Sequence, residues 1–135
     1  MIDLKYFLMS RPSRSNGFTD VVLQNNSLPD ADFDEISTEY VFLNKYIDCP
    51  LMINAMTGGT EYSGDINREL ARLAVKFNIP IAVGSQTVAF DNPEAADTFK
   101  RVRDINRDGI VIANLSANSD IDDAYKAIDM IDADA

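Results

Sequence analysis

Three short apolar segments that end in small polar residues recur at a constant interval along the chain. They are residues 50–59, which end in Met-Thr-Gly-Gly, residues 79–86 and residues 110–116. Met56 and Ser85 are 29 residues apart, and so are Ser85 and Asn114. Apolar runs of this length, bounded by Pro or Gly, are typical of parallel-sheet strands covered on both faces. The constant interval therefore predicts three consecutive βα units.

The stretches that follow these segments have the pattern of amphipathic helices. Ser63 can cap the first helix, which then has apolar side chains at helical spacing. Residues 92–94 are Asn-Pro-Glu, which places a cap, a proline and a carboxylate at the start of the second helix. The third helix is predicted to begin near Ser119 or Asp120. Each predicted strand is thus followed by one predicted helix.

The first 48 residues lack this repeat and are predicted to form an N-terminal extension. Residues 5–10 have the pattern of a short helix or arm, and residues 20–24 and 40–44 are β-prone. We therefore expect strand or hairpin content in residues 1–48 and a repeat domain in residues 49–135.

Composition and charge exclude several classes of function. The 135 residues have a formal net charge of −10, which argues against nucleic-acid binding. The absence of His removes His-based catalysis, and the single Cys49 excludes an internal disulfide framework. No apolar run approaches the roughly 18 residues of a membrane span, so we expect a cytoplasmic protein without a membrane partner. Eight Asp residues between positions 104 and 135 are interpreted as a solvated face.

Three βα units with polar residues at the strand ends allow two α/β architectures. One is a doubly wound sheet, and the other is an arc of a (β/α)₈ barrel. The first unit lacks the Gly-x-Gly-x-x-Gly pattern, and no Gly-Lys-Ser/Thr phosphate loop is present. The barrel is therefore favoured.

The motifs at the strand ends resemble those of the type 2 isopentenyl-diphosphate isomerases, in the N-terminal portion of their sequence. The resembling stretches are residues 53–59, 82–86 and 113–116, with residues 27–29 and 34–38 upstream. The resemblance implies the first three βα units of a (β/α)₈ TIM barrel, preceded by the extension. It also implies FMN, NADPH and Mg²⁺ as cofactors, and the interconversion of isopentenyl and dimethylallyl diphosphate.

The resemblance transfers residue by residue to a set of candidate contacts. Cofactor contacts match at Ala55, Met56, Thr57, Ser85 and Asn114. Substrate contacts match at Ser85, Gln86 and Thr87, and many relatives have Arg or His in place of Thr87. Short side chains and exposed backbone amides suit the polar edge of a flavin ring. We interpret Gly58 and Gly59 as permitting close approach of a ligand to the backbone. No residue is assigned a catalytic proton transfer or a metal ligand, because reduced flavin itself is thought to move the proton in this family.

The resemblance also implies that several family residues lie outside this chain. They include an N-terminal Arg-Lys pair, a substrate Gln, a Mg²⁺-binding Glu and the loops around the FMN phosphate. We therefore expect the 135 residues to be an incomplete and inactive portion of an isomerase. Unpaired strand edges at residues 51–55 or 110–114 predict self-association into a homo-oligomer. Two alternatives stay open, another FMN-dependent barrel oxidoreductase and a non-catalytic truncated remnant.

Overall fold

The computed structural model describes residues 18–28 and 30–135, in two compact units, Met1–Ile36 and Ser37–Ala135. In the first unit, the described residues are all exposed and contain two short 3₁₀ turns, Phe18–Asp20 and Phe33–Glu35. The strand predicted at residues 20–24 is wrong, because no described residue of this unit finds the paired neighbour that a strand needs. The helix end predicted at residues 5–10 lies outside the described residues.

The second unit begins with a β-hairpin. Strand β1 (Tyr40–Phe42) pairs antiparallel with β2 (Lys45–Ile47). Both turn residues are left-handed, with φ of 47° at Leu43 and 61° at Asn44, as a two-residue hairpin turn requires. The hairpin content predicted for the extension is confirmed. The division between an N-terminal extension and a repeat domain at residue 48 stays a prediction.

A small parallel sheet follows the hairpin. Strand β3 (Ile81–Ala82) pairs with β4 (Val111–Ile112), and Ile53 forms a parallel bridge to Ile81. On the other side of β4, the Asp134 amide donates to the Val111 carbonyl at 2.8 Å, and the Ala113 amide donates to the Ala135 carbonyl at 2.7 Å. The four segments therefore lie side by side in chain order.

This order corrects one of the two places predicted for an unpaired strand edge. Residues 110–114 do not form an edge, because residues 134–135 hydrogen-bond to them. Residues 51–55 pair on one side, through Ile53 and Ala55, and find no second strand among the residues that the structure describes.

Three helices follow the three strand segments. They are α2 (Glu61–Lys76), α3 (Pro93–Ile105) and α4 (Ile121–Ile131). Asn92 caps α3 and Asp120 caps α4, as predicted. The predicted cap of α2 is wrong, because Thr60 is the cap and Ser63 returns the hydrogen bond as the partner in a capping box. Within residues 18–28 and 30–135, every helix is too short or too polar to cross a membrane.

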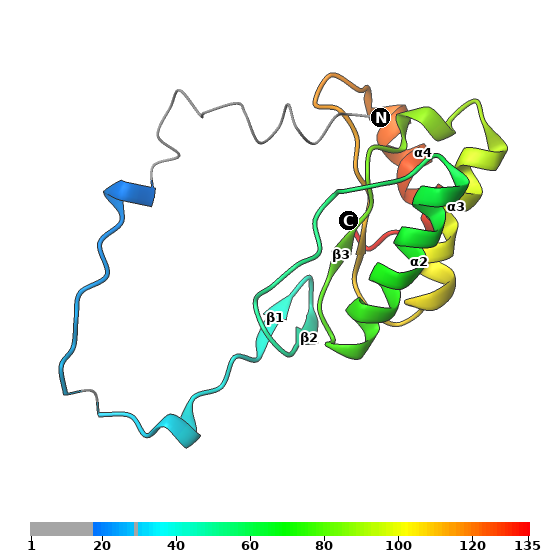
Figure 1. Ribbon diagram of the computed structural model, residues 1–135. Coiled ribbons are helices and arrows are strands. Elements are labelled where there is room, and N and C mark those ends of the chain that lie inside the picture. The colour runs from blue at the N-terminus through cyan, green and yellow to red at the C-terminus, as the bar shows by residue number, and fades with distance from the viewer. Residues whose placement is uncertain (1–17, 29) are drawn as a thin grey trace. The chain divides into compact units, whose positions relative to one another are not determined.

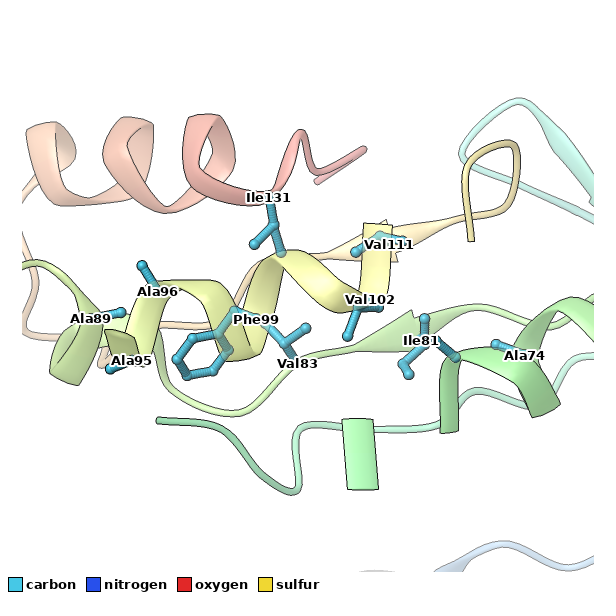
Figure 2. Close-up of a cluster of buried hydrophobic side chains, with 11 residues drawn as sticks. Ala74, Ile81, Val83, Ala89, Ala95, Ala96, Phe99, Val102, Val111 and Ile131 are labelled. Carbon is cyan, nitrogen blue, oxygen red and sulfur yellow. The ribbon is translucent and has the colours of Figure 1, made fainter. Parts of the chain in front are cut away.

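Helix α3 is the centre of the hydrophobic core. It packs between α2 and α4, and the three helices lie together on one side of β3 (Figure 1). Phe99 and Val102 of α3 are fully buried, and Figure 2 shows them beside Val83 and Val111 of the strand region. The cluster also includes Ala71, Ala74, Ile81, Ala89, Ala95, Ala96 and Ile131. One layer of helices thus covers one face of the sheet.

A charged network holds the amino-terminal side of this sheet. Lys45 of the hairpin donates to the Asp108 carbonyl at 3.1 Å and forms an ion pair with Asp134 at 2.8 Å. Asp134 also pairs with Arg103 at 2.7 Å and accepts from the Val111 amide at 2.9 Å. The interpretation of the acidic segment as a solvated face is therefore wrong for Asp134, which has structural partners on three elements.

These partners give Asp134 an unusual acidity and a testable effect on stability. Burial raises the pKa of Asp134, but the hydrogen bonds from Lys45, Val111 and Arg103 outweigh it and lower the pKa from 3.8 to about 2. Because the folded pKa lies below the unfolded value, the stabilisation is present above pH 3.8 and is lost as the pH falls toward 2.

We expect Asp134→Asn to cost about 1 kcal/mol near neutral pH, after allowance for solvent screening. Chemical denaturation of wild type and variant at several pH values measures this difference, which should vanish near the lower pKa. Asp129→Asn, on an exposed turn of α4, is the matched control and should change little. A difference that does not depend on pH would contradict the role of the carboxylate.

Candidate functional site

The three predicted ligand-facing loops meet at the carboxyl ends of the strand segments. The Gly84 amide donates to the Thr57 carbonyl at 3.0 Å, which joins the first loop to the second. The Gln86 amide donates to the Asn114 carbonyl at 2.9 Å, which joins the second loop to the third. The carboxyl ends of parallel strands are where α/β proteins bind small molecules. The structure therefore brings the predicted site residues together on adjacent loops.

The first loop is tied down by a buried residue that the sequence did not single out. Asn67 of α2 is 3% exposed and accepts from the Thr57 hydroxyl at 2.7 Å. Its amide nitrogen donates back to the Thr57 carbonyl at 3.2 Å. A Cβ at Gly84 would lie 2.6 Å from the same carbonyl, so glycine permits this close approach. The Thr57 hydroxyl proton is thus committed to the protein.

The remaining residues of the first loop have different exposures. Ala55 has a left-handed backbone with φ of 44°, and the Met56 side chain is 74% exposed. Gly59 also has a positive φ, of 91°, and its amide donates to the Thr98 hydroxyl at 2.8 Å. This loop can offer a ligand the Met56 side chain.

Gly58 has a packing role, which gives a reason for glycine at this position other than the predicted approach of a ligand. A Cβ at this position would lie 1.9 Å from Cε1 of Phe99, whose ring is completely buried in the core. Glycine is therefore required so that the loop can pack on α3.

The second loop contains two exposed hydroxyls and one buried amide. Ser85 and Thr87 are exposed, and their hydroxyl oxygens lie 3.3 Å apart. Gln86, at the start of a 3₁₀ turn (Gln86–Ala89), is fully buried. Its side chain donates to the Ala127 carbonyl at 2.9 Å and accepts from the Asn114 amide at 3.1 Å. Ser85 and Thr87 can face a ligand, whereas the Gln86 side chain is directed into the protein.

The third loop adds one more neutral polar group. The Asn114 side chain is half-buried and has no hydrogen bond to another residue that the structure describes. A small recess of about 190 Å³ lies next to it, lined mainly by Leu115, Ala124, Ala127 and Ile128. Ligand pockets usually exceed about 300 Å³, so this recess could take only part of a flavin or substrate.

The charge of the site limits its chemistry. All of the predicted contacts, from Ala55 to Asn114, are neutral side chains. In residues 18–28 and 30–135, no group of three or more His, Cys, Asp or Glu side chains is arranged to hold a metal ion. These loops can donate and accept hydrogen bonds, and the described residues give no support for a Mg²⁺ site.

The fold and the loops define an α/β protein with neutral polar groups gathered at the carboxyl ends of consecutive parallel segments. No family model matches the chain. Curated relatives named isopentenyl-diphosphate delta-isomerase are similar to it over most of its length. The relative from Listeria innocua is 42% identical over 86% of this chain, and that from a Streptomyces species is 42% identical over 91%. One from Bacillus cereus is 38% identical over 98%.

The chain spans about a third of the length of these relatives, from 32% to 38%. Their names give the isomerase activity but no type and no flavin. The identification with the N-terminal portion of the type 2, FMN-dependent enzymes is therefore corrected. It specified a type and a cofactor that the names of the relatives do not contain. What the relatives support is a resemblance to isopentenyl-diphosphate delta-isomerases.

Proposed function

We propose that this protein functions in the interconversion of isopentenyl and dimethylallyl diphosphate. The observation that carries this proposal is the 38–42% identity to named isomerases over 86–98% of the chain. The structure adds that the three loops lie together at one end of the sheet, where such a substrate would bind.

For the complete fold we propose a (β/α)₈ barrel to which these residues contribute consecutive units. Two features support this proposal. The segments at Ile53, β3, β4 and residues 134–135 lie side by side in chain order, whereas a doubly wound sheet reverses its order at a switch point. The helices α2, α3 and α4 also lie on one side of the strands, as they do in a barrel wall.

We further propose FMN as the cofactor, held at its polar ring edge by Asn114 and by the exposed part of the first loop. The fit rests on the side-chain amide of Asn114, which has no hydrogen-bond partner among the described residues, and on the exposed Met56 of the first loop. When bound in its reduced form, FMN would supply the proton-transfer chemistry. Thr57 would act mainly through its backbone, because its hydroxyl proton is bonded to Asn67.

For the substrate we propose that the Ser85 and Thr87 hydroxyls donate hydrogen bonds to the isoprenoid diphosphate. Both are exposed and lie close enough to bind neighbouring oxygens of one anion. NADPH as the reductant, a homo-oligomeric state and a cytoplasmic location stay predictions. Mg²⁺ does not fit the described residues, and we assign it no step.

The test of this proposal is the titration of the complete protein that contains these 135 residues with FMN, followed by an isomerase assay with NADPH, Mg²⁺ and isopentenyl diphosphate. We expect flavin binding in the wild type and an affinity that is roughly tenfold weaker in Asn114→Leu, because one buried hydrogen bond to the ring is lost. Asn118→Leu makes the same change at an exposed position in the same loop and should leave the affinity unchanged.

Equal flavin affinities of the two variants would remove Asn114 from the site. Flavin binding with reduction of a substrate but without isomerisation would favour the oxidoreductase alternative, and the absence of both activities would favour the non-catalytic one.

A further inference from the structure

The side chain of Gln86 joins three parts of the proposed site. Its amide nitrogen donates to the Ala127 carbonyl of α4 at 2.9 Å and lies 3.6 Å from the Met130 sulfur. Its amide oxygen accepts from the Asn114 amide at 3.1 Å, and its own backbone amide donates to the Asn114 carbonyl at 2.9 Å. Gln86 therefore bonds to both polar groups of the Asn114 backbone.

The burial of Gln86 makes this arrangement rigid. Its side chain is 0% exposed, so no water replaces a lost partner without rearrangement. A buried amide left without a hydrogen bond is costly, which favours the single rotamer that satisfies both ends. The neighbours Ser85 and Thr87 flank this fixed residue and are both exposed. Their positions therefore depend on the residue between them.

We propose that Gln86 is a positioning residue that sets the geometry of the site without touching the ligand. It holds the Asn114 backbone on one side and the Ser85 and Thr87 hydroxyls on the other, in a fixed relation to α4. This inference rests on the proposed function, which places ligands against Asn114, Ser85 and Thr87. It reverses the prediction that the Gln86 side chain itself contacts substrate.

A positioning role has a measurable consequence because binding depends steeply on the placement of polar groups. Loops that shift by about 1 Å lose much of the benefit of otherwise intact contacts. A double variant distinguishes a residue that contacts the ligand directly from one that positions another residue, because the losses of binding affinity of the single variants combine differently. Two independent contacts to a ligand give additive losses, whereas a residue that acts through Asn114 loses its effect once Asn114 is replaced.

The experiment compares Gln86→Met, which keeps a similar side-chain volume but lacks both hydrogen bonds, with Val102→Ala. Val102 is fully buried in the hydrophobic core and takes no part in the hydrogen bonds of the Gln86 side chain, so its variant is the control for a general loss of stability. Melting temperatures, FMN affinity, and KM and kcat are measured for the complete protein that contains these 135 residues, as wild type and as both variants. Gln86→Met is also combined with Asn114→Leu.

We expect Gln86→Met to weaken FMN binding and raise KM by about tenfold, and Val102→Ala to change either by less than about twofold at a comparable loss of stability. In the Asn114→Leu background, the added effect of Gln86→Met on FMN affinity, the quantity for which additivity is judged, should fall below about twofold. Parallel losses in Gln86→Met and Val102→Ala would overturn the proposal in favour of a merely structural role. Full additivity with Asn114→Leu would overturn it in favour of an independent contact.

Hydrogen exchange at the Asn114 amide separates this inference from the proposed function. We expect Gln86→Met to lose protection at that amide and Val102→Ala to keep it, because the Gln86 oxygen is its acceptor. If the wild type binds no FMN and turns over no substrate, the proposed function fails, and with it the role of Gln86 in binding. If the wild type is active and the amide stays protected in Gln86→Met, only the positioning role fails.

Discussion

Replacement of Gly58 by valine is expected to destabilise the protein by about 3 kcal/mol or more, because overpacking at a rigid contact cannot relax. The added Cβ would lie 1.9 Å from the Phe99 ring, and Phe99 is 0% exposed at the centre of α3. Figure 2 shows the ring beside Ala95 and Val83, within the cluster that links the helices to the strands. Urea denaturation followed by circular dichroism measures the loss.

Two further variants identify the cause of this effect. Gly59→Ala introduces a Cβ at a positive φ of 91° and should cost about 1 kcal/mol, mainly from backbone strain. Phe99→Leu shortens the obstructing ring, so it should recover part of the stability when combined with Gly58→Ala. If Gly58→Val instead melts like wild type and loses only ligand affinity, the original interpretation of Gly58 as a site of ligand approach would be correct.

The repeat could be predicted because its signals are local. Asn92 and Pro93 start α3, and Asp120 starts α4, as predicted, since a cap depends on residues within one helical turn. The apolar runs that contain β3 and β4 were visible for the same reason. The cap of α2 was harder to predict. Thr60 and Ser63 both have a hydroxyl that can accept a hydrogen bond from a backbone amide at the start of the helix, and the structure has Thr60 as the cap.

The contacts that hold the site were not visible in the sequence. Asn67 is 10 residues from Thr57, and Gln86 is 28 residues from Asn114, and both bonds are chosen by packing between elements. The sequence does not show whether a glutamine side chain is buried or exposed. Gln86 was therefore predicted to contact the substrate, whereas its side chain is fully buried. Residues 20–24 were predicted to form a strand from their β-propensity. They do not form one, because a strand also needs a partner to pair with.

Arg103 is a second residue whose role depends on distant partners. Its guanidinium donates to the carbonyls of residues from two loops, Asn106, Arg107, Gly109, Ile131 and Asp132. It also pairs with Asp134 at 2.7 Å, and its side chain is only 14% exposed. One planar group thereby joins the loop after α3 to the end of α4, where Asp132 has a left-handed φ of 47°. These carbonyls lie at two chain reversals, where Arg103 supplies them with a donor, and the Gly109 carbonyl also accepts from Lys45 at 3.4 Å.

We expect Arg103→Met to destabilise the protein by about 3 kcal/mol, because it removes the donor to several carbonyls and one of the three hydrogen-bond partners of the Asp134 carboxylate. Arg103→Lys keeps the charge but has no fork of donors, so it should recover only the interaction with Asp134 and remain well below wild type. Arg101→Met, on the same helix as Arg103, removes ion pairs to the exposed Glu61 and Asp65 of α2 and should have a much smaller effect. Denaturation midpoints of the three variants rank these losses. If Arg103→Lys matched wild type, the charge alone would be sufficient, and the carbonyl contacts would contribute nothing to the connection between α3 and α4.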